Sequence, residues 1–162
     1  MEIKRPVLYN DVEGCVDAIL ERVGKDIMFG TPLALGKPNQ LINALYKRAK
    51  EDPSIRLRII TALSLEKPTP GSELERRIMD PLVERIFKDF PDFEYIKDLR
   101  KNDLPESFEL YEFYNKSGSF LNIPHAQQNY ISTNYTHAPR DIFGMGINVA
   151  GQLIAKKEID GK

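Results

Sequence analysis

Cysteine is almost absent from this 162-residue chain, which holds one cysteine and two histidines. An internal disulfide is therefore impossible, and the Cys and His side chains are too few for a zinc cage. Any metal site would need carboxylate ligands, and we assign no metal-binding residue and no bound cofactor. Cys15 follows Val12 and precedes Val16 and Ile19 at helical spacing, where a thiol packs as a small hydrophobic side chain.

The chain also lacks an excess of either charge, because 23 basic and 24 acidic residues leave a net charge of -1. It has no Lys/Arg-rich block of the kind that neutralises a phosphate backbone, so we expect no nucleic acid partner. No segment approaches the roughly 20 apolar residues that cross a bilayer, and the N-terminus lacks the apolar core of a signal peptide. We expect a soluble cytoplasmic protein without membrane contact.

Three sequence motifs that carry familiar chemistry are missing. The glycines match neither a P-loop nor the G-x-G-x-x-G dinucleotide fingerprint, which argues against a nucleotide-binding α/β domain. No serine lies in the G-x-S-x-G elbow that accompanies a catalytic histidine in α/β-hydrolases. His125 and His137 are therefore more simply explained as structural hydrogen-bonding residues than as catalytic bases.

Apolar periodicity is clear in the first part of the chain. It predicts a helix over residues 11–23, a strand over 26–29, a helix after Pro38 and a buried strand over 57–63. A strand, a helix and a second strand in this order form a right-handed βαβ unit with parallel strands. The later expected elements are a helix over 72–87, a short helix over 94–100, a strand over 107–114, a helix over 138–145 and a strand over 147–155.

These elements predict an α/β fold with an open, mostly parallel sheet flanked by helices. We expect a single domain over residues 1–162, divided into an N-terminal helix over 1–24, a core over 25–155 and a tail over 156–162. Ser72 and Glu75 form a capping box at the start of the helix over 72–87. Because Pro81 lies inside that helix, we expect a kink or two helices that meet near Asp80.

Two segments could carry a binding site. Residues 30–39 join a buried strand to a helix N-terminus, where backbone N–H groups suit a carboxylate, a phosphate or an oxyanion. The glycines there could equally serve only a tight turn. Residues 115–135 show no period and predict a long ordered loop rich in amides, hydroxyls and aromatic rings. Such groups must either bond one another or face a ligand, and both alternatives stay open.

These segments resemble the acetyl-CoA hydrolase / CoA transferase family. The resemblance covers about residues 25–155 and lies mainly in GTPLALGKPNQLINALYKRAKEDPSIRLR from Gly30, TALSLEKP from Thr61 and PHAQQNYISTNYTHAPRD from Pro124. It implies an enzyme of two similar α/β halves with the active site between them. Such enzymes move coenzyme A between an acyl thioester and a carboxylate through a covalent glutamyl-CoA thioester, whereas in hydrolases water completes the cycle.

The family's nucleophilic glutamate belongs to the second half of its pattern, and no glutamate here sits at a matching motif. We therefore name no catalytic residue and expect this chain alone to be inactive. The resemblance implies that the first loop lines the acyl or carboxylate pocket and that the amide-rich loop faces the same cleft. The substrate-binding candidates are Gly30, Thr31, Pro32, Gly36, Gln128, Asn129, Asn134 and Tyr135.

The partners implied are an acyl-CoA, a short carboxylate and a C-terminal catalytic half, from the same gene or as a partner subunit. If that half normally covers one side of the domain, the isolated chain should expose an apolar patch and self-associate, so a homodimer is possible. The alternative function is a non-catalytic module with the same fold that binds CoA or an acyl group, or acts in interaction.

Overall fold

The structure of the chain is a computed structural model that describes residues 6–156. Residues 157–162 of the expected tail and the first five residues lie outside the described part. Four parallel strands form one sheet in the order β3-β2-β1-β4. The strands are β1 (Asp26–Gly30), β2 (Arg56–Thr61), β3 (Phe108–Glu112) and β4 (Val149–Ala150). The prediction of an open α/β fold with a parallel sheet is confirmed.

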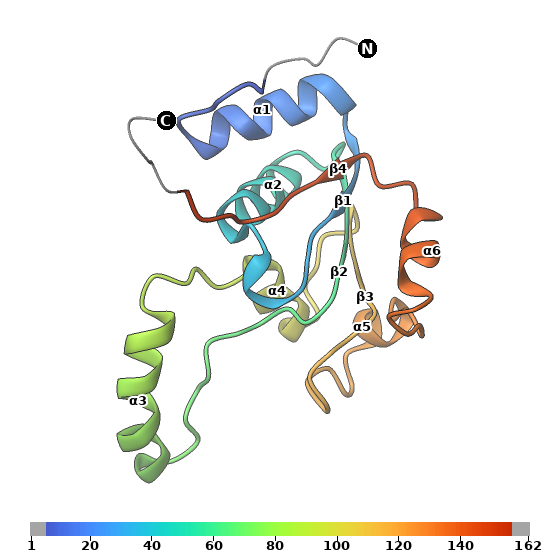
Figure 1. Cartoon of the computed structure of the whole chain (residues 1–162). Helices are drawn as coiled ribbons and strands as arrows, with labels where there is room; N and C mark the ends of the chain where they lie inside the picture. Colours follow the sequence, from blue (N-terminus) through green and yellow to red (C-terminus); the bar gives the residue numbers. More distant parts are fainter. Residues whose placement is uncertain (1–5, 157–162) are drawn as a thin grey trace.

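Helices cover both faces of this sheet (Figure 1). The chain moves from β1 to β2 to β3 in one direction, and the right-handed crossover rule places the connecting helices on one face. The return from β3 to β4 runs the opposite way, so the crossover helix lies on the other face. The first face carries α1 (Val12–Val23), α2 (Asn39–Glu51) and α4 (Glu94–Lys101), and the second carries α6 (Ala138–Phe143). The short helix α5 (Pro124–Gln128) lies at the free edge of β3, where Leu110 N donates to His125 Nε2.

One apolar cluster fills the space between the sheet and its first helical layer. Ile27 and Phe29 from β1 and Leu57 and Ile59 from β2 have almost no exposed surface and pack in this cluster. Met28 and Ile60, which point to the opposite face, are equally buried. Burial on both faces explains the apolar run of β1 and of the second half of β2, whereas β3 alternates between buried and partly exposed residues. The helices add the remaining core residues, among them Val16, Ile42, Leu45, Tyr46, Tyr95, Ile96 and Leu99.

The helix N-termini follow the capping signals of the sequence. Asp11 accepts a hydrogen bond from the backbone N–H of Gly14 at 2.7 Å and starts α1. Ser72 accepts one from Glu75 N at 3.2 Å at the start of α3 (Glu73–Phe87), and the Glu75 carboxylate reaches back to Gly71 N at 2.6 Å. The expected capping box is present, although its return bond goes to the residue before Ser72.

Three expectations about elements need correction, and a fourth is narrowed. Of the two alternatives at Pro81, two helices that meet near Asp80 are excluded, because α3 runs through Pro81 as one helix. The segment over 115–135 is not wholly irregular, because it contains the short helix α5, which starts at Pro124. A helix this short shows no apolar periodicity in the sequence. A 3-10 turn over Ala34–Gly36 interrupts the first loop. The strand expected over 147–155 pairs only at Val149 and Ala150.

The shortened fourth strand has a visible cause. Asn148, just before β4, uses its side chain to bond the backbone of β1: Oδ1 accepts from Met28 N at 2.9 Å, and Nδ2 donates to Asp26 O at 2.8 Å. Beyond Gly151 the chain turns away from β1, and Leu153 N donates to Gly36 O at 2.8 Å. The last segment thus crosses the end of the sheet and closes over the first loop.

Candidate functional site

The carboxyl ends of the strands meet at one edge of the sheet because all four strands are parallel. The ends are Gly30, Thr61, Glu112 and Ala150. The direction of the chain reverses at β1, since β2 and β4 flank it on opposite sides. In open α/β sheets ligands bind outside the carboxyl ends of the strands at such a reversal, where the two crossovers leave a crevice. The topology alone therefore selects this edge as the candidate site.

A cavity of about 460 Å³ lies at this reversal. Its volume is within the usual range of small-molecule sites, about 300–1,000 Å³. The wall is mainly apolar and includes no ionisable side chain. It is formed by Gly30, Thr31, Pro32, Ile60, Thr61, Phe113, Ile142, Ile147, Ala150, Gly151 and Gln152.

Two glycines let the backbone approach the cavity closely. A methyl group on Gly30 would come within 2.8 Å of Ile147 Cδ1, the end of a side chain that can shift. A methyl group on Gly151 would collide with the ring of Phe29, which is fully buried in the core and cannot move in the same way. Gly30 therefore shapes the cavity, whereas Gly151 is needed for the packing of the last segment on the sheet.

Two threonine hydroxyls at this edge differ in their bonding. Thr61 Oγ1 donates to Pro32 O at 3.1 Å and holds the first loop against β2. Thr31 Oγ1 is buried and has no hydrogen-bond partner within the part of the chain that the structure describes. A buried hydroxyl without a partner carries a free-energy cost that a bound acceptor or donor could remove. Thr31 Oγ1 therefore has unused hydrogen-bonding capacity, but a ligand would reach it only after a small shift of the wall, because the atom has almost no exposed surface. Gln152 is the exposed polar side chain of the wall.

A buried polar network supports the edge from behind. Lys37 Nζ donates to Ala62 O at 2.5 Å and to Leu63 O at 3.0 Å, which are carbonyls just beyond β2. Glu112 Oε1 accepts from Ser64 N at 2.9 Å and from Ser64 Oγ at 2.7 Å. Ser64 Oγ also lies 2.8 Å from the hydroxyl of Tyr95. This network fixes the chain after β2 relative to β3 and to α4.

Burial changes the acidity of the network. Desolvation lowers the pKa of Lys37 to about 8, although the nearby Glu112 carboxylate acts in the opposite direction. Desolvation raises the pKa of Glu112 despite its bonds from Ser64, and it raises the pKa of Tyr95. None of these groups lines the cavity. Their role in the described structure is therefore to hold the edge rather than to contact a ligand.

The first predicted segment contributes directly to the cavity. Gly30, Thr31 and Pro32 form part of the wall. Gly36 does not, because it lies in the 3-10 turn, where its N–H donates to Leu33 O at 3.2 Å and its carbonyl accepts from Leu153.

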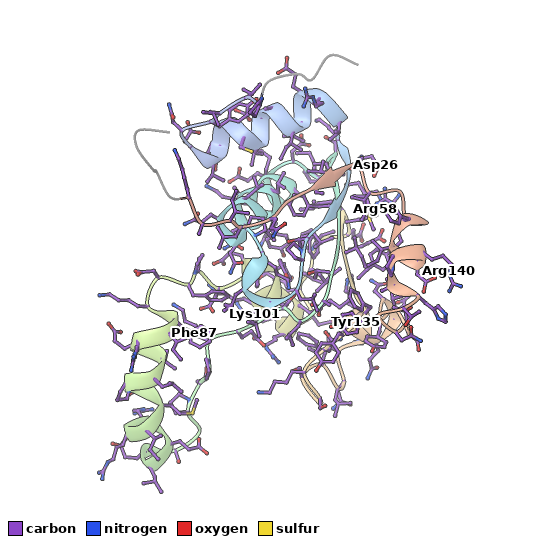
Figure 2. The ribbon with its side chains drawn as sticks, viewed as in Figure 1. Asp26, Arg58, Phe87, Lys101, Tyr135 and Arg140 are labelled. Carbon is purple, nitrogen blue, oxygen red and sulfur yellow. The ribbon has the colours of Figure 1, made fainter. Side chains whose placement is uncertain are left out.

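The amide-rich segment lies outside the wall. Asn129 Nδ2 is 3.1 Å from His125 Nε2, and Asn134 Oδ1 accepts from Thr136 N and His137 N at 3.0 and 3.1 Å. Gln128 is exposed. Tyr135 is exposed at the same end of the molecule as the carboxyl ends of the strands (Figure 2), and its ring packs edge-on against Phe113 at 5.8 Å. Only Tyr135 has a link to the cavity, through Phe113.

The histidine in this segment has a structural partner. His125 Nε2 accepts a hydrogen bond from Leu110 N at 3.1 Å, on the free side of β3. Burial lowers the pKa of His125. This neutral, accepting form matches the expected structural role, in which the imidazole ties α5 to the sheet.

Sequence reasoning missed Lys37, Glu112 and Gly151. Lys37 lies in a glycine- and proline-rich loop where a lysine looks solvent-exposed, although its side chain is 1% exposed. Glu112 ends a β-rich run at an inward position, which was the available signal for a buried carboxylate. Gly151 follows the apolar run of β4, and only its contact with Phe29 explains why a glycine is needed there.

A larger hollow of about 820 Å³ lies between α1, the N-terminal segment and β4. Its wall includes Cys15, which is partly covered, and Asn148. The amide of Asn148 is anchored to β1 by two bonds, which use its Oδ1 and one N–H of its Nδ2. We place the candidate site at the carboxyl edge, because the reversal of chain direction lies there.

Metal ligands, membrane-spanning helices and known relatives were each sought as further indications of function. Over residues 6–156, no group of three or more His, Cys, Asp or Glu side chains is placed to hold a metal ion. No helix in the same range is long and apolar enough to span a membrane. Comparison of the chain with protein-family models, curated proteins and solved structures finds no match.

Proposed function

We propose that this chain is the substrate-pocket half of an acetyl-CoA hydrolase / CoA transferase. The observation that carries the proposal is the cavity at the carboxyl edge, whose wall includes Gly30, Thr31 and Pro32. The same residues open the segment on which the resemblance to that family depends. The binding segment that the sequence suggests and the binding edge that the sheet topology selects thus share these residues.

The chemistry of the wall suits the acyl end of the substrate. Ile60, Phe113 and Ile142 offer apolar contact to a short acyl chain, and Thr31 Oγ1 offers one hydrogen bond to its carbonyl or carboxylate oxygen. The absence of ionisable side chains from the wall favours a neutral thioester. The remainder of coenzyme A would extend out of the cavity toward the second half.

The catalytic glutamate in this proposal comes from that second half. The Glu112 carboxylate lies nearest in sequence to the site, but its Oε1 is bonded to Ser64 and its side chain is 4% exposed. A carboxylate held in this way cannot attack a thioester without breaking the network. A glutamate of the partner half would attack the thioester carbonyl and expel the CoA thiolate, which gives an acyl-glutamyl anhydride. The thiolate would then attack the glutamyl carbonyl, which releases the acyl group as a free carboxylate and leaves the glutamyl-CoA intermediate.

A trapping experiment tests this division of labour. The chain is incubated with acetyl-CoA, treated with borohydride and measured by mass spectrometry, alone and with the C-terminal half of a family member. Borohydride reduces a glutamyl thioester to the corresponding alcohol and releases CoA, so the reacted residue is found by its lower mass. We expect no reduced glutamate on this chain in either case, and a reduced glutamate on the partner half together with turnover. A reduced glutamate at any position of this chain would contradict the proposal.

The alternative is a non-catalytic module that binds CoA or an acyl group. It is favoured by the absence of any acid or base from the cavity wall. The two functions differ in one outcome: the module binds acetyl-CoA stoichiometrically, and the C-terminal half does not restore turnover.

A further inference from the structure

The helix α3 stands apart from the sheet and from the other helices (Figure 1). None of its residues is buried. An uninterrupted row of large apolar side chains at spacing four faces solvent. Their exposed fractions are 71% for Leu74, 71% for Ile78, 49% for Leu82 and 55% for Ile86.

The base of α3 is nevertheless fixed to the body. Phe87 packs edge-on against Phe90 at 5.6 Å between ring centroids, and Phe90 packs against the buried Phe93 at 6.3 Å. On the incoming side, Arg100 Nε donates to Glu66 Oε1 at 2.6 Å. The C-terminal end of α3 and the loop that leads to it are therefore attached to the body, and the apolar row faces solvent.

A row of this kind needs a partner surface. Isolated helices of about 15 residues are marginal in water, and most helical stability in proteins comes from packing of the apolar face. Side chains at spacing four also form the ridge that is used in the commonest class of helix–helix packing. The row on α3 is thus a ready helix-packing surface without a helix against it in the described part of the chain.

The charges within the row indicate which partner fits. At 100° per residue, Glu75 and Arg85 fall on the same face as the apolar row. They lie five residues on either side of Asp80, the middle of the helix. An antiparallel pair of α3 helices with its two-fold axis at Asp80 would place Glu75 opposite Arg85 of the second copy. The same register places Leu74 opposite Ile86 and Ile78 opposite Leu82.

A membrane surface suits the helix less well. Interfacial helices that bind anionic lipid carry an excess of Lys and Arg on the polar face. The helix α3 has four acidic and three basic residues, so it has no such attraction.

We propose that α3 packs antiparallel against α3 of a second copy of this chain and forms a two-fold symmetric dimer. In the dimer, residue i of one copy lies opposite residue 160 − i of the other, as the symmetry of an isologous interface requires. This inference is independent of the proposed activity, because α3 contributes nothing to the cavity wall.

The first test compares two matched substitutions by light scattering over a range of concentrations. We expect the wild-type chain to have twice the mass of one chain. Ile78→Glu should have the mass of one chain, and Ile154→Glu, which alters an isoleucine 75% exposed elsewhere, should stay dimeric. Circular dichroism should show Ile154→Glu folded like the wild type, and Ile78→Glu should lose at most the helical signal of α3, which is marginal without a partner. The rest of the fold should be unchanged, because Ile78 makes no buried contact within one copy.

The second test uses charge reversal and mixing. Glu75→Lys and Arg85→Glu should each weaken the dimer, because each puts like charges opposite one another in the homodimer. Glu75→Lys also removes the bond from Gly71 N to the Glu75 carboxylate, so the single variants are compared with their mixture, in which that loss persists while the charges match. An equimolar mixture of the two variants should recover dimer, because both contacts then join opposite charges. Recovery on mixing is specific to the antiparallel register.

Three outcomes would overturn the inference. A wild-type chain that stays monomeric at all concentrations has no such interface. A dimer that survives Ile78→Glu uses another surface. Binding of the chain to anionic vesicles that Ile78→Glu abolishes, with no dimer in solution, would assign the row to a membrane.

Discussion

At the residue scale, two threonines allow the contribution of a hydroxyl to ligand binding to be measured apart from its contribution to stability. Thr61 Oγ1 is bonded to Pro32 O, whereas Thr31 Oγ1 is buried without a partner in the described chain. Valine has the same shape as threonine but no hydroxyl, so the same substitution removes a used group at one position and an unused group at the other. The pair therefore tests the assignment of the cavity without a change in its volume.

We expect Thr31→Val to leave the free energy of unfolding unchanged or slightly higher, because no hydrogen bond is lost. Its affinity for acetyl-CoA should fall about five- to tenfold, the equivalent of one neutral hydrogen bond. Thr61→Val should lower the free energy of unfolding by about 1–2 kcal/mol, because it leaves the Pro32 carbonyl without its donor. Urea unfolding and isothermal titration calorimetry measure the two quantities. Equal affinities for Thr31→Val and wild type would show that the hydroxyl does not contact the ligand.

The pH dependence of stability tests the burial of Lys37. Burial lowers the pKa of its ammonium group to about 8 in the folded state. In the unfolded chain the pKa of this group is about 10.4. Between these values the unfolded state binds more protons, so the free energy of unfolding rises with pH. The rise should amount to about 3 kcal/mol for this residue.

Urea unfolding at several values from pH 7.5 to 10.5 measures this rise against the variant Lys37→Met, which should lack it. Burial raises the pKa of Tyr95, so near the upper end of this pH range Tyr95 lowers the free energy of unfolding as the pH rises. This effect is opposite in sign to that of Lys37 and is the same in both proteins. The difference between the two proteins therefore isolates Lys37. Parallel curves for wild type and variant would mean that Lys37 is solvated.

At the scale of elements, the pairing of β4 with β1 depends on one side chain. Asn148 bonds Met28 N and Asp26 O, and so extends the contact of the short β4 with β1 by one position. Asn148→Ala should lower the free energy of unfolding by about 1–2 kcal/mol and expose the Met28 amide to solvent. Hydrogen exchange should show faster exchange at Met28, while Asn10→Ala, in the exposed N-terminal segment, should have no effect. Unchanged exchange at Met28 would contradict the role of Asn148.

The sequence predicted the parts of the fold that depend on local pattern. The strands over 26–30 and 56–61 and the helix between them follow from apolar runs and periodicity, and the parallel sheet follows from their order. The end of β4 could not be predicted, because it depends on tertiary contacts: beyond Gly151 the chain leaves β1, and Leu153 N donates to Gly36 O. The short helix α5 was missed for a different reason, since one turn started by Pro124 shows no period.

The site could be predicted only in part for a related reason. Residues 30–32 follow a buried strand, and that position leads them to the carboxyl edge in any parallel sheet. The amides of residues 128–134 carry the right chemistry for a ligand, but whether they meet the cavity depends on how α5 and α6 pack. In this structure Asn129 and Asn134 bond their own segment.

The two ends of the sheet have different character at the scale of the whole molecule. At the amino end, Asp26 and Arg58 form an ion pair at 2.6 Å between neighbouring strands (Figure 2). At the carboxyl end, a mainly apolar cavity lies where the chain reverses direction, and a buried polar network lies behind it. Parallel α/β folds bind their ligands outside the carboxyl ends of the strands, at such a reversal.

The measurement that tests the central claim most directly is the mapping of amide chemical shifts on titration of the ¹⁵N-labelled chain with acetyl-CoA. We predict saturable shifts concentrated at Gly30, Thr31, Thr61 and Gly151, with amides of α1 unchanged. Shifts centred instead on the hollow between α1 and β4, or no shifts at any concentration, would contradict the placement of an acyl-CoA site at the carboxyl edge of the sheet.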